Sequence, residues 1–223
     1  MAEFRIVVLA SGRGSNLRAL LEAERAGVLG GARIVCVASN KPGCAAVALA
    51  ADAGIETLAY DPRDFVSREG YDQTLIGLAM ERKPDLLVCA GFMRVLSADS
   101  VQLARGRMIN IHPSLLPKYP GLRTHERALE AGDAEHGASV HQVVPEVDAG
   151  PVIAQARVPV FPADTAEALA SRVLLREHPL LVASVREFAE GRLTAGPSGV
   201  AWRGIPLHAP LSLDDQGRLS EPR

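Results

Sequence analysis

Short apolar segments alternate with helical segments along most of this chain, and this alternation restricts the fold more than any other feature. The expected strands lie at 4–9, 33–38, 55–59, 86–90, the start of 108–121, 139–144 and 152–160. Nearly continuous apolar runs such as 4–9 and 86–90 are typical of parallel strands that helices cover on both faces. The sequence therefore predicts an α/β fold, a single Rossmann-like domain with a mostly parallel, twisted sheet of about seven strands and helices on both faces.

The end of the chain breaks this pattern. Residues 165–188 have helical composition, but Pro179 is expected to kink or break that helix, because proline lacks the N–H that a helix interior needs. From Gly191 onward glycine, proline and polar residues dominate, and only 199–202 indicates a strand. We expect a principal domain at 1–190 and a C-terminal extension at 191–223 that packs on it or is partly mobile.

The composition excludes several classes of protein. The 223 residues carry a net charge of −2, so no basic surface indicates nucleic-acid binding. No segment approaches the roughly 18 consecutive apolar residues of a membrane span, and the N-terminus lacks a signal-peptide pattern. Cys36, Cys44 and Cys89 lack metal-ligand spacing. We expect a cytoplasmic protein without a metal, and a monomer or homodimer.

A glycine-rich turn follows the first strand and leads into a helix. It reads Ala-Ser-Gly-Arg-Gly-Ser-Asn at 10–16. Free N–H groups and the helix dipole make such a turn a site for anions. The Gly-Lys-Ser/Thr of a P-loop is absent, and Leu17 stands where a dinucleotide fingerprint has its third glycine. A small phosphorylated ligand is therefore favoured over NAD, and the alternative is a tight turn without a ligand.

The segment 108–121 combines a short strand with a loop that carries three prolines. Asn110 and His112 are two residues apart, so on a strand their side chains point to the same face. One offers an amide donor and the other an imidazole that titrates near neutrality. We interpret this pair as a reaction centre. The alternative is a strand end capped by polar residues.

Two further loops have either a functional or a structural interpretation. The apolar loop 91–96 follows a buried strand, and ligands of open α/β sheets bind beyond the carboxyl ends of such strands. It can therefore line a pocket, or simply cover the core. Asp148 lies in a turn before Ala-Gly-Pro and by itself is a turn carboxylate.

Taken together, three motifs resemble the phosphoribosylglycinamide formyltransferase family, a branch of the folate-dependent formyltransferases. They are the loop at 11–16, Asn-Ile-His-Pro-Ser-Leu-Leu-Pro at 110–117 and Val-Asp-Ala-Gly-Pro at 147–151. The resemblance covers roughly residues 4–195, and Lys-Tyr-Pro-Gly at 118–121 narrows it to this branch. It implies transfer of the formyl group of 10-formyltetrahydrofolate to the amino group of glycinamide ribonucleotide in purine biosynthesis.

The resemblance also implies roles for individual residues. The catalytic set would be Asn110, His112 and Asp148, with Ser139 supporting the acid. The nucleotide substrate would be held by Gly14, Ser15, Asn16 and Glu177. The folate co-substrate would contact Arg68, Met93, Arg94, Val95, Leu96 and Asn110. This chain departs from the family pattern at Leu174, where a long polar residue is common, and at the early Pro179.

Formyl transfer between two nitrogens passes through a tetrahedral intermediate that carries an oxyanion, and the attacking amine belongs to the substrate. Asn110 and a protonated His112 would donate to the oxyanion. Asp148 would raise the pKa of His112 and accept the proton that the amine loses. The remaining histidines are expected to be structural or exposed: His125, His136, His141, His178 and His208.

Two alternatives stay open at this point. The chain could use formyl-folate for another acceptor, as formyl-tRNA synthases, formyl-folate hydrolases and sugar-nucleotide formyltransferases do. It could also be a non-catalytic nucleotide-binding module, although loss of Asn110, His112 or Asp148 would then be expected, and all three are present.

Overall fold

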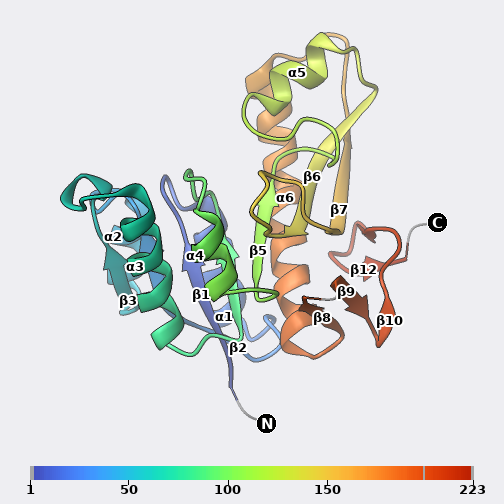
Figure 1. Ribbon diagram of the computed structural model, residues 1–223. Coiled ribbons are helices and arrows are strands. Elements are labelled where there is room, and N and C mark those ends of the chain that lie inside the picture. The colour runs from blue at the N-terminus through green and yellow to red at the C-terminus, as the bar shows by residue number, and fades with distance from the viewer. Residues whose placement is uncertain (1–2, 198, 222–223) are drawn as a thin grey trace.

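The computed structural model describes residues 3–197 and 199–221. A nine-stranded sheet in the order β12-β11-β7-β6-β5-β4-β1-β2-β3 forms the centre of the molecule (Figure 1). Its strands are β1 (Phe4–Leu9), β2 (Ala32–Ser39), β3 (Glu56–Ala59), β4 (Leu86–Cys89), β5 (Met108–His112), β6 (Glu135–Gln142), β7 (Val152–Pro159), β11 (Leu211–Leu213) and β12 (Leu219–Ser220). The predicted α/β fold is confirmed. The sheet has two strands more than predicted, because β11 and β12 are too short to show a period.

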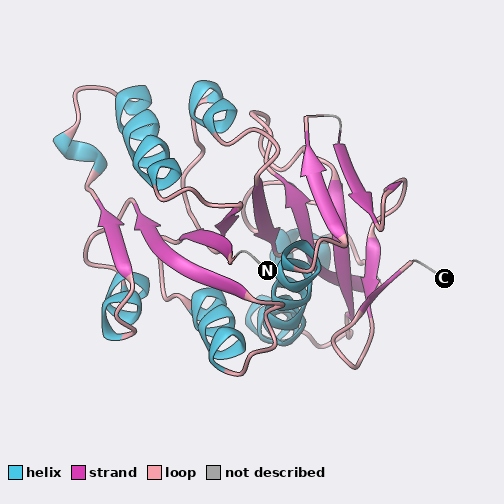
Figure 2. Ribbon diagram, turned by 90° about the horizontal axis from the view of Figure 1, so that it is seen from below, coloured by secondary structure: helices cyan, strands magenta, loops and turns pink. Residues whose placement is uncertain are grey.

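Helices cover both faces of this sheet (Figure 2). They are α1 (Ser15–Arg25), α2 (Ala45–Asp52), α3 (Arg68–Glu81), α4 (Ala98–Leu103), α5 (Thr124–Glu130) and α6 (Ala166–Ala189), with a 3₁₀ turn at Pro62–Asp64. α3 and α4 share a buried cluster with Val7, whereas α1, α2 and α6 share another with Val8. Successive residues of β1 thus face opposite layers, which explains the continuous apolar run. Within the described residues, no helix has the length and apolar character needed to cross a membrane.

The strand directions place three loops at one edge of the sheet. β3, β2, β1, β4 and β5 are all parallel, whereas β6 runs antiparallel to both β5 and β7. The loops that follow β1, β4 and β5 therefore leave from the same carboxyl edge, where open α/β sheets bind their ligands. These are the loops in which the sequence predicted functional residues.

The C-terminal residues form more structure than the sequence indicates. β8 (Leu193–Gly196), β9 (Gly199–Trp202) and β10 (Ile205–Pro206) form a small antiparallel sheet, and β9 matches the predicted strand. β11 then pairs in parallel with β7 and antiparallel with β12, which extends the main sheet. The tail therefore packs on the body. A domain boundary at residue 190 stays a prediction.

Pro179 does not break α6, so of the two outcomes that the sequence led us to expect, a kink or a break, the break is wrong. The helix is continuous from Ala166 to Ala189. Proline leaves the carbonyl four residues earlier without its donor, and Leu175 at that position is exposed, so water can supply the bond. Leu180 and Leu181, directly after the proline, are fully buried and hold the second half of the helix against the sheet.

Candidate active site

The antiparallel ladder between β5 and β6 brings four polar side chains together. Asn110 lies opposite His141 in this ladder, and His112 lies opposite Ser139. The Nδ2 of Asn110 is 3.0 Å from the Nε2 of His141. The Nδ1 of His141 is 3.0 Å from the carbonyl oxygen of Gln142, to which only a protonated nitrogen can donate. Nε2 is therefore the nitrogen that accepts from Asn110 when the ring is neutral.

Asp148 lies between the two histidines. Its Oδ2 is 3.4 Å from the Nδ1 of His112, and its Oδ1 is 3.5 Å from the Nε2 of His141. Oδ2 also accepts a hydrogen bond of 2.8 Å from the backbone N–H of Gly121. The structure thus brings Asn110, His112 and Asp148 together, as the sequence predicts, and adds His141, which the sequence analysis classed as structural or exposed.

The backbone of the Asp148 loop is held tightly against β6. Asp148 itself has a left-handed φ of 52°, a conformation that aspartate tolerates better than most residues. A Cβ at Gly150 would lie 1.8 Å from the carbonyl oxygen of Gln142, so only glycine fits there. This close approach fixes the position of the Asp148 carboxylate relative to the two histidines.

His112 carries a lower pKa than the sequence analysis expected. Its Nε2 is 2.9 Å from the carbonyl oxygen of Tyr119, so this nitrogen carries a hydrogen and Nδ1 faces Asp148. Burial lowers the pKa of His112, and the opposing effects of the Tyr119 carbonyl and the Asp148 charge are smaller. The predicted rise is therefore wrong. The amount of water excluded from the ring was not visible in the sequence.

Asp148 holds its charge in spite of its position. Burial alone would raise its pKa, but its contact with His141, the N–H of Gly121 and the charge of His112 together lower it below the ordinary value. The site therefore contains a carboxylate that stays ionised, and its charge favours the protonated form of His112 against the effect of burial.

Ser139 contacts the loop after β5 and not the acid that it was expected to support. Its buried hydroxyl donates to the carbonyl oxygen of Ser114 at 2.6 Å and accepts from the N–H of Leu116 at 3.0 Å. The side-chain amide of Gln155 donates to the same hydroxyl at 3.0 Å. Ser139 therefore fixes the loop that follows His112, which positions the imidazole indirectly.

The glycine-rich turn has the geometry of an anion site. Gly14 is the N-cap of α1, with a left-handed φ of 76° and no side-chain cap. The first N–H groups of the helix are therefore left for a ligand. A Cβ at Gly14 would lie 3.0 Å from the Cα of Ala46, so the turn is also pressed against α2.

Asn16 and Glu177 are 161 residues apart in the sequence and meet beside this turn. The Nδ2 of Asn16 donates to the Oε1 of Glu177 at 2.6 Å, and among the described residues the Oδ1 of Asn16 is buried without a hydrogen-bond partner. Burial raises the pKa of Glu177, although the bond from Asn16 partly opposes this effect. Both residues were predicted to contact the nucleotide, and the unpaired Oδ1 is an acceptor that a ligand hydroxyl or amine can satisfy.

Most of the residues predicted to contact the folate lie in the loop after β4, and Arg68, at the start of α3, is hydrogen-bonded to that loop. Arg68 donates through its guanidinium to the carbonyl oxygen of Val95 at 2.5 Å, and the Nε of Arg94 is 2.5 Å from the Oδ1 of Asp72. Asp72 is fully buried and also accepts from the N–H of Ser97 at 3.0 Å. Leu96 is buried, whereas Met93 and Val95 are exposed and available to an apolar ligand ring. Asp72, which the sequence analysis missed, fixes this loop.

Ser11 connects the glycine-rich turn to the loop after β4. Its hydroxyl donates to the Oδ1 of Asn40 at 2.5 Å and accepts from the N–H of Met93 at 2.8 Å. Its own N–H donates to the carbonyl oxygen of Gly91 at 3.0 Å. Asn110 lies opposite Cys89 at the end of the β4–β5 ladder. The anion turn, the loop after β4 and the histidine cluster therefore lie side by side along one edge of the sheet.

Comparison with known proteins decides the family. Residues 4–185 match the sequence model of the family described as Formyl transferase. This chain belongs to the formyl transferase family. The resemblance that the 110–117 and 147–151 motifs indicated is therefore confirmed.

Individual formyl transferases are similar to this chain over most of their length. The chain is 49% identical to the phosphoribosylglycinamide formyltransferase of Escherichia coli over 188 residues, which cover 84% of this chain and 88% of that protein. The solved structure of the phosphoribosylglycinamide formyltransferase from Coxiella burnetii has a TM-score of 0.87 and 45% identity, over 92% of this chain and 96% of that one.

A longer relative shares the same region. The trifunctional purine biosynthetic protein adenosine-3 of Drosophila melanogaster is 50% identical over 175 residues, which cover 78% of this chain but only 13% of that protein. This formyl transferase thus corresponds to one part of the insect polypeptide.

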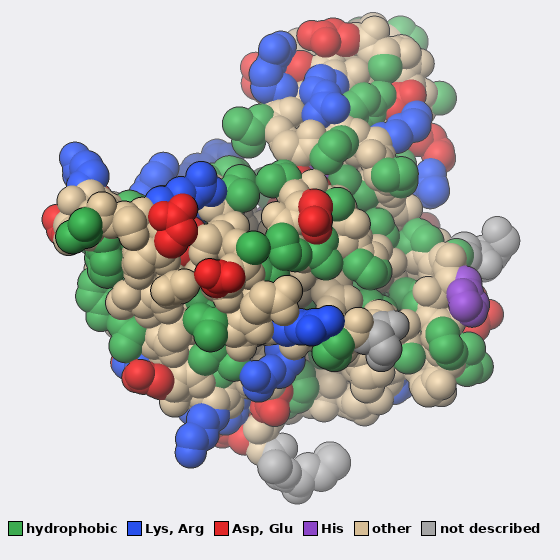
Figure 3. Space-filling view, in the orientation of Figure 1, with side chains coloured by type: hydrophobic (Ala, Val, Ile, Leu, Met, Phe, Trp, Pro, Cys, Tyr) green, Lys and Arg blue, Asp and Glu red, His purple; other side chains and the backbone are tan. Residues whose placement is uncertain are grey.

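The charge distribution agrees with small-molecule substrates. On the face in Figure 3, basic and acidic side chains are interspersed with hydrophobic ones, and no broad basic area is visible. Among the described residues, no three His, Cys, Asp or Glu side chains are grouped to hold a metal ion. The absence of a metal stays a prediction, as do the roles of the individual site residues.

Proposed function

We propose that this chain transfers the formyl group of 10-formyltetrahydrofolate to the amino group of glycinamide ribonucleotide, a step of purine biosynthesis. The names of these similar proteins support this reaction. The observation that carries the mechanism is the cluster at the end of β5. In it Asn110 contacts His141, His141 contacts Asp148 and Asp148 contacts His112, at distances of 3.0–3.5 Å. Such a cluster can stabilise an oxyanion and accept a proton, which are the two tasks of amide-forming formyl transfer.

Asn110 and His112 provide the donors. One N–H of the Asn110 amide is directed at His141, and the other is available to the developing oxyanion. The Nε2 of His112 donates to the Tyr119 carbonyl, which leaves Nδ1 as the nitrogen that meets the reacting atoms. A protonated Nδ1 beside Asp148 donates a charge-assisted hydrogen bond to the oxyanion as negative charge develops on that oxygen. Each such donor contributes roughly 3 kcal/mol in comparable sites.

Asp148 accepts the proton that the attacking amine loses. The attacking amine becomes positively charged as it bonds to the formyl carbon and must then lose a proton. The ionised carboxylate of Asp148, with its lowered pKa, is the acceptor within reach, directly or through a water molecule. Protonating Asp148 weakens its hold on both histidines, so the carboxylate and the two imidazoles act as one unit.

The two substrates approach from neighbouring loops. The N–H groups at Gly14, Ser15 and Asn16 bind the phosphate, and Glu177 binds a hydroxyl of the ribose beside it. The loop 93–96, braced by Arg68, binds the folate ring with Met93 and Val95 exposed to it. A cytoplasmic location, the absence of nucleic-acid partners and a monomeric or homodimeric state complete this proposal.

One assay separates this function from the alternatives. The enzyme is incubated with 10-formyltetrahydrofolate and glycinamide ribonucleotide, and the deformylated folate is followed by absorbance. We expect stoichiometric formation of formylglycinamide ribonucleotide. Deformylation at the same rate without the nucleotide would instead indicate a hydrolase, and no turnover with a correctly folded protein would indicate a binding module.

A further inference from the structure

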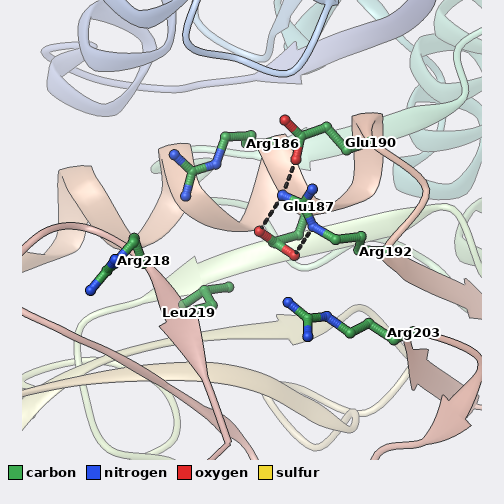
Figure 4. Close-up of a pocket in the computed structure, with 7 residues that line it drawn as sticks. All are labelled: Arg186, Glu187, Glu190, Arg192, Arg203, Arg218 and Leu219. Carbon is green, nitrogen blue, oxygen red and sulfur yellow. Dashed lines mark hydrogen bonds and ion pairs between the residues drawn. The ribbon is translucent and has the colours of Figure 1, made fainter.

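A cavity of about 340 Å³ lies between the end of α6 and the C-terminal strands (Figure 4). Its lining consists almost entirely of charged side chains: Arg186, Glu187, Glu190, Arg192, Arg203, Arg218 and Leu219. α6 and the residues after it supply four of these, and the turn between β9 and β10 supplies Arg203. Arg218 lies in the turn before β12, and Leu219 is the first residue of that strand. Four arginines thus converge from separate parts of the fold.

Both carboxylates of the lining form ion pairs with a single arginine, Arg192. Glu187 accepts two hydrogen bonds of 2.7 Å from Arg192 and a third of 3.2 Å from the indole N–H of Trp202. Glu190 forms an ion pair with the same guanidinium. Arg192 therefore offsets one of the two carboxylate charges, and the four arginines and two glutamates leave the lining with a net charge of +2.

Two of those arginines have unused donors. Within residues 3–197 and 199–221, Arg186 and Arg203 form no ion pair, whereas Arg218 pairs with Asp214 at 3.0 Å. Arg186 makes one long bond of 3.3 Å to the carbonyl oxygen of Gly217, and its Nε is buried without a partner. A buried donor of this kind costs free energy unless a ligand satisfies it.

Arg203 is held in place by its backbone and by an aromatic ring. Its N–H donates to the carbonyl oxygen of Arg192 at 2.6 Å, and its backbone has a left-handed φ of 52°. The guanidinium carbon lies 4.4 Å from the centre of the Trp202 ring. Stacking uses the face of the guanidinium and leaves its in-plane N–H groups free for an anion.

We propose that this cavity binds a diphosphate group, either free or carried by a nucleotide. Guanidinium groups bind phosphate oxygens through paired hydrogen bonds, and three of them here come from three elements. The cavity exceeds the size of a single phosphate and falls within the range of small-ligand sites. The C-terminal dipole of α6 opposes an anion, so the arginine side chains must supply the binding.

This site is separate from the proposed substrate site. Glu177 and Arg186 lie on the same helix nine residues apart, which corresponds to about 14 Å along the axis. A Cβ at Gly30 would lie 2.9 Å from the carbonyl oxygen of Arg186, so this end of α6 meets the turn before β2. That turn lies at the amino edge of the parallel strands, opposite the edge that carries the glycine-rich turn.

The test is calorimetric titration with inorganic pyrophosphate. The background carries Ser15→Asp, because a carboxylate at the start of α1 repels anions from the glycine-rich turn. We expect one pyrophosphate per chain in this background. The affinity should fall at least about ten-fold when Arg186→Gln and Arg203→Gln are added, and stay unchanged with Arg157→Gln, an exposed arginine paired with Glu135.

Further measurements keep the result interpretable. Arg203→Gln alone changes an exposed side chain, and it should weaken pyrophosphate binding even if the double variant folds poorly. Titration with ADP in place of pyrophosphate distinguishes the two sources of the diphosphate group. If the site takes a nucleotide, ADP should bind more tightly than pyrophosphate. If it takes a free diphosphate, the two should bind equally well. Formyl transfer by the Arg203→Gln variant should stay within about two-fold of the unaltered enzyme. Absence of binding at millimolar pyrophosphate, or an affinity indifferent to Arg203, would overturn the proposal.

Discussion

The side-chain amide of Asn110 lies 3.0 Å from the Nε2 of His141, on the neighbouring strand of the sheet. This contact orients the amide, because His141 is itself fixed by its bond to the carbonyl oxygen of Gln142. An oriented amide donates to a developing oxyanion without first having to reorganise. We therefore expect His141 to act as a positioning residue for Asn110.

His141→Leu should lower kcat by about ten-fold or more, because the Asn110 amide loses its acceptor. His141→Gln supplies a carbonyl oxygen near the same place and should retain most of the turnover. Steady-state kinetics with both substrates saturating checks this. Equal kcat for the Leu and Gln variants would show that the contact does not orient Asn110.

Replacing His112 by Ala, or Asp148 by Asn, should lower turnover by about 10² or more, with much smaller changes in substrate affinity. The reason is that both groups act on charge that exists only in the transition state. Single-turnover rates and equilibrium binding of each substrate separate the two effects. A variant with normal kcat and a raised KM would remove its residue from the catalytic set.

The pH dependence of His112 follows from two opposing effects. Burial lowers its pKa and the charge of Asp148 raises it, so Asp148→Asn should lower the pKa of His112 further. The alkaline limb of the rate profile, which requires the proton on His112, should then move to lower pH. NMR titration of the His112 ring in both proteins measures this directly. An unchanged or higher pKa in the variant would contradict the coupling of the two groups.

Ser15→Asp should raise the KM for glycinamide ribonucleotide by about ten-fold or more and leave the KM for the folate unchanged. The new carboxylate repels the phosphate but favours the helix dipole, so α1 stays folded. Ser15→Ala is the control, since the proposed contact uses the backbone N–H. A substitution at Gly14 is a poorer test, because its left-handed φ and its contact with Ala46 would distort the turn by themselves.

Stability should fall in acid because of His136. Burial, assisted by the neighbouring His125, lowers the pKa of His136 to about 4 from an ordinary 6.5. The unfolded chain therefore binds the proton first, so this contribution is complete above pH 6.5 and is lost as the pH falls to about 4. It amounts to about 3 kcal/mol at most.

Urea denaturation between pH 4 and 8 checks the contribution of His136. His136→Gln should show a flatter dependence of the free energy of unfolding on pH. His208→Gln, at an exposed position, should follow the unaltered protein. Parallel curves for all three proteins would assign the acid sensitivity to other groups.

Local patterns in the sequence were sufficient for much of the fold. The apolar runs predicted β1 to β7, and the two-residue spacing placed Asn110 and His112 on one face of β5. His141 could not be found in this way, because its place opposite Asn110 depends on the antiparallel register of β5 and β6. The pKa of His112 depends on burial by distant segments, which no local pattern contains.

The pairing of β11 with β7 has a consequence for the synthesis of the chain. β7 ends at Pro159, but the strand that pairs with the middle of its edge, at Ala154 and Gln155, begins only at Leu211, about fifty residues later. During translation the nascent sheet therefore presents an open row of backbone donors and acceptors to any neighbouring polypeptide. A premature stop codon before Leu211 would release a chain that carries the whole histidine cluster and an unpaired edge of β7. Such a truncated product should be lost to aggregation rather than to a defect in its chemistry.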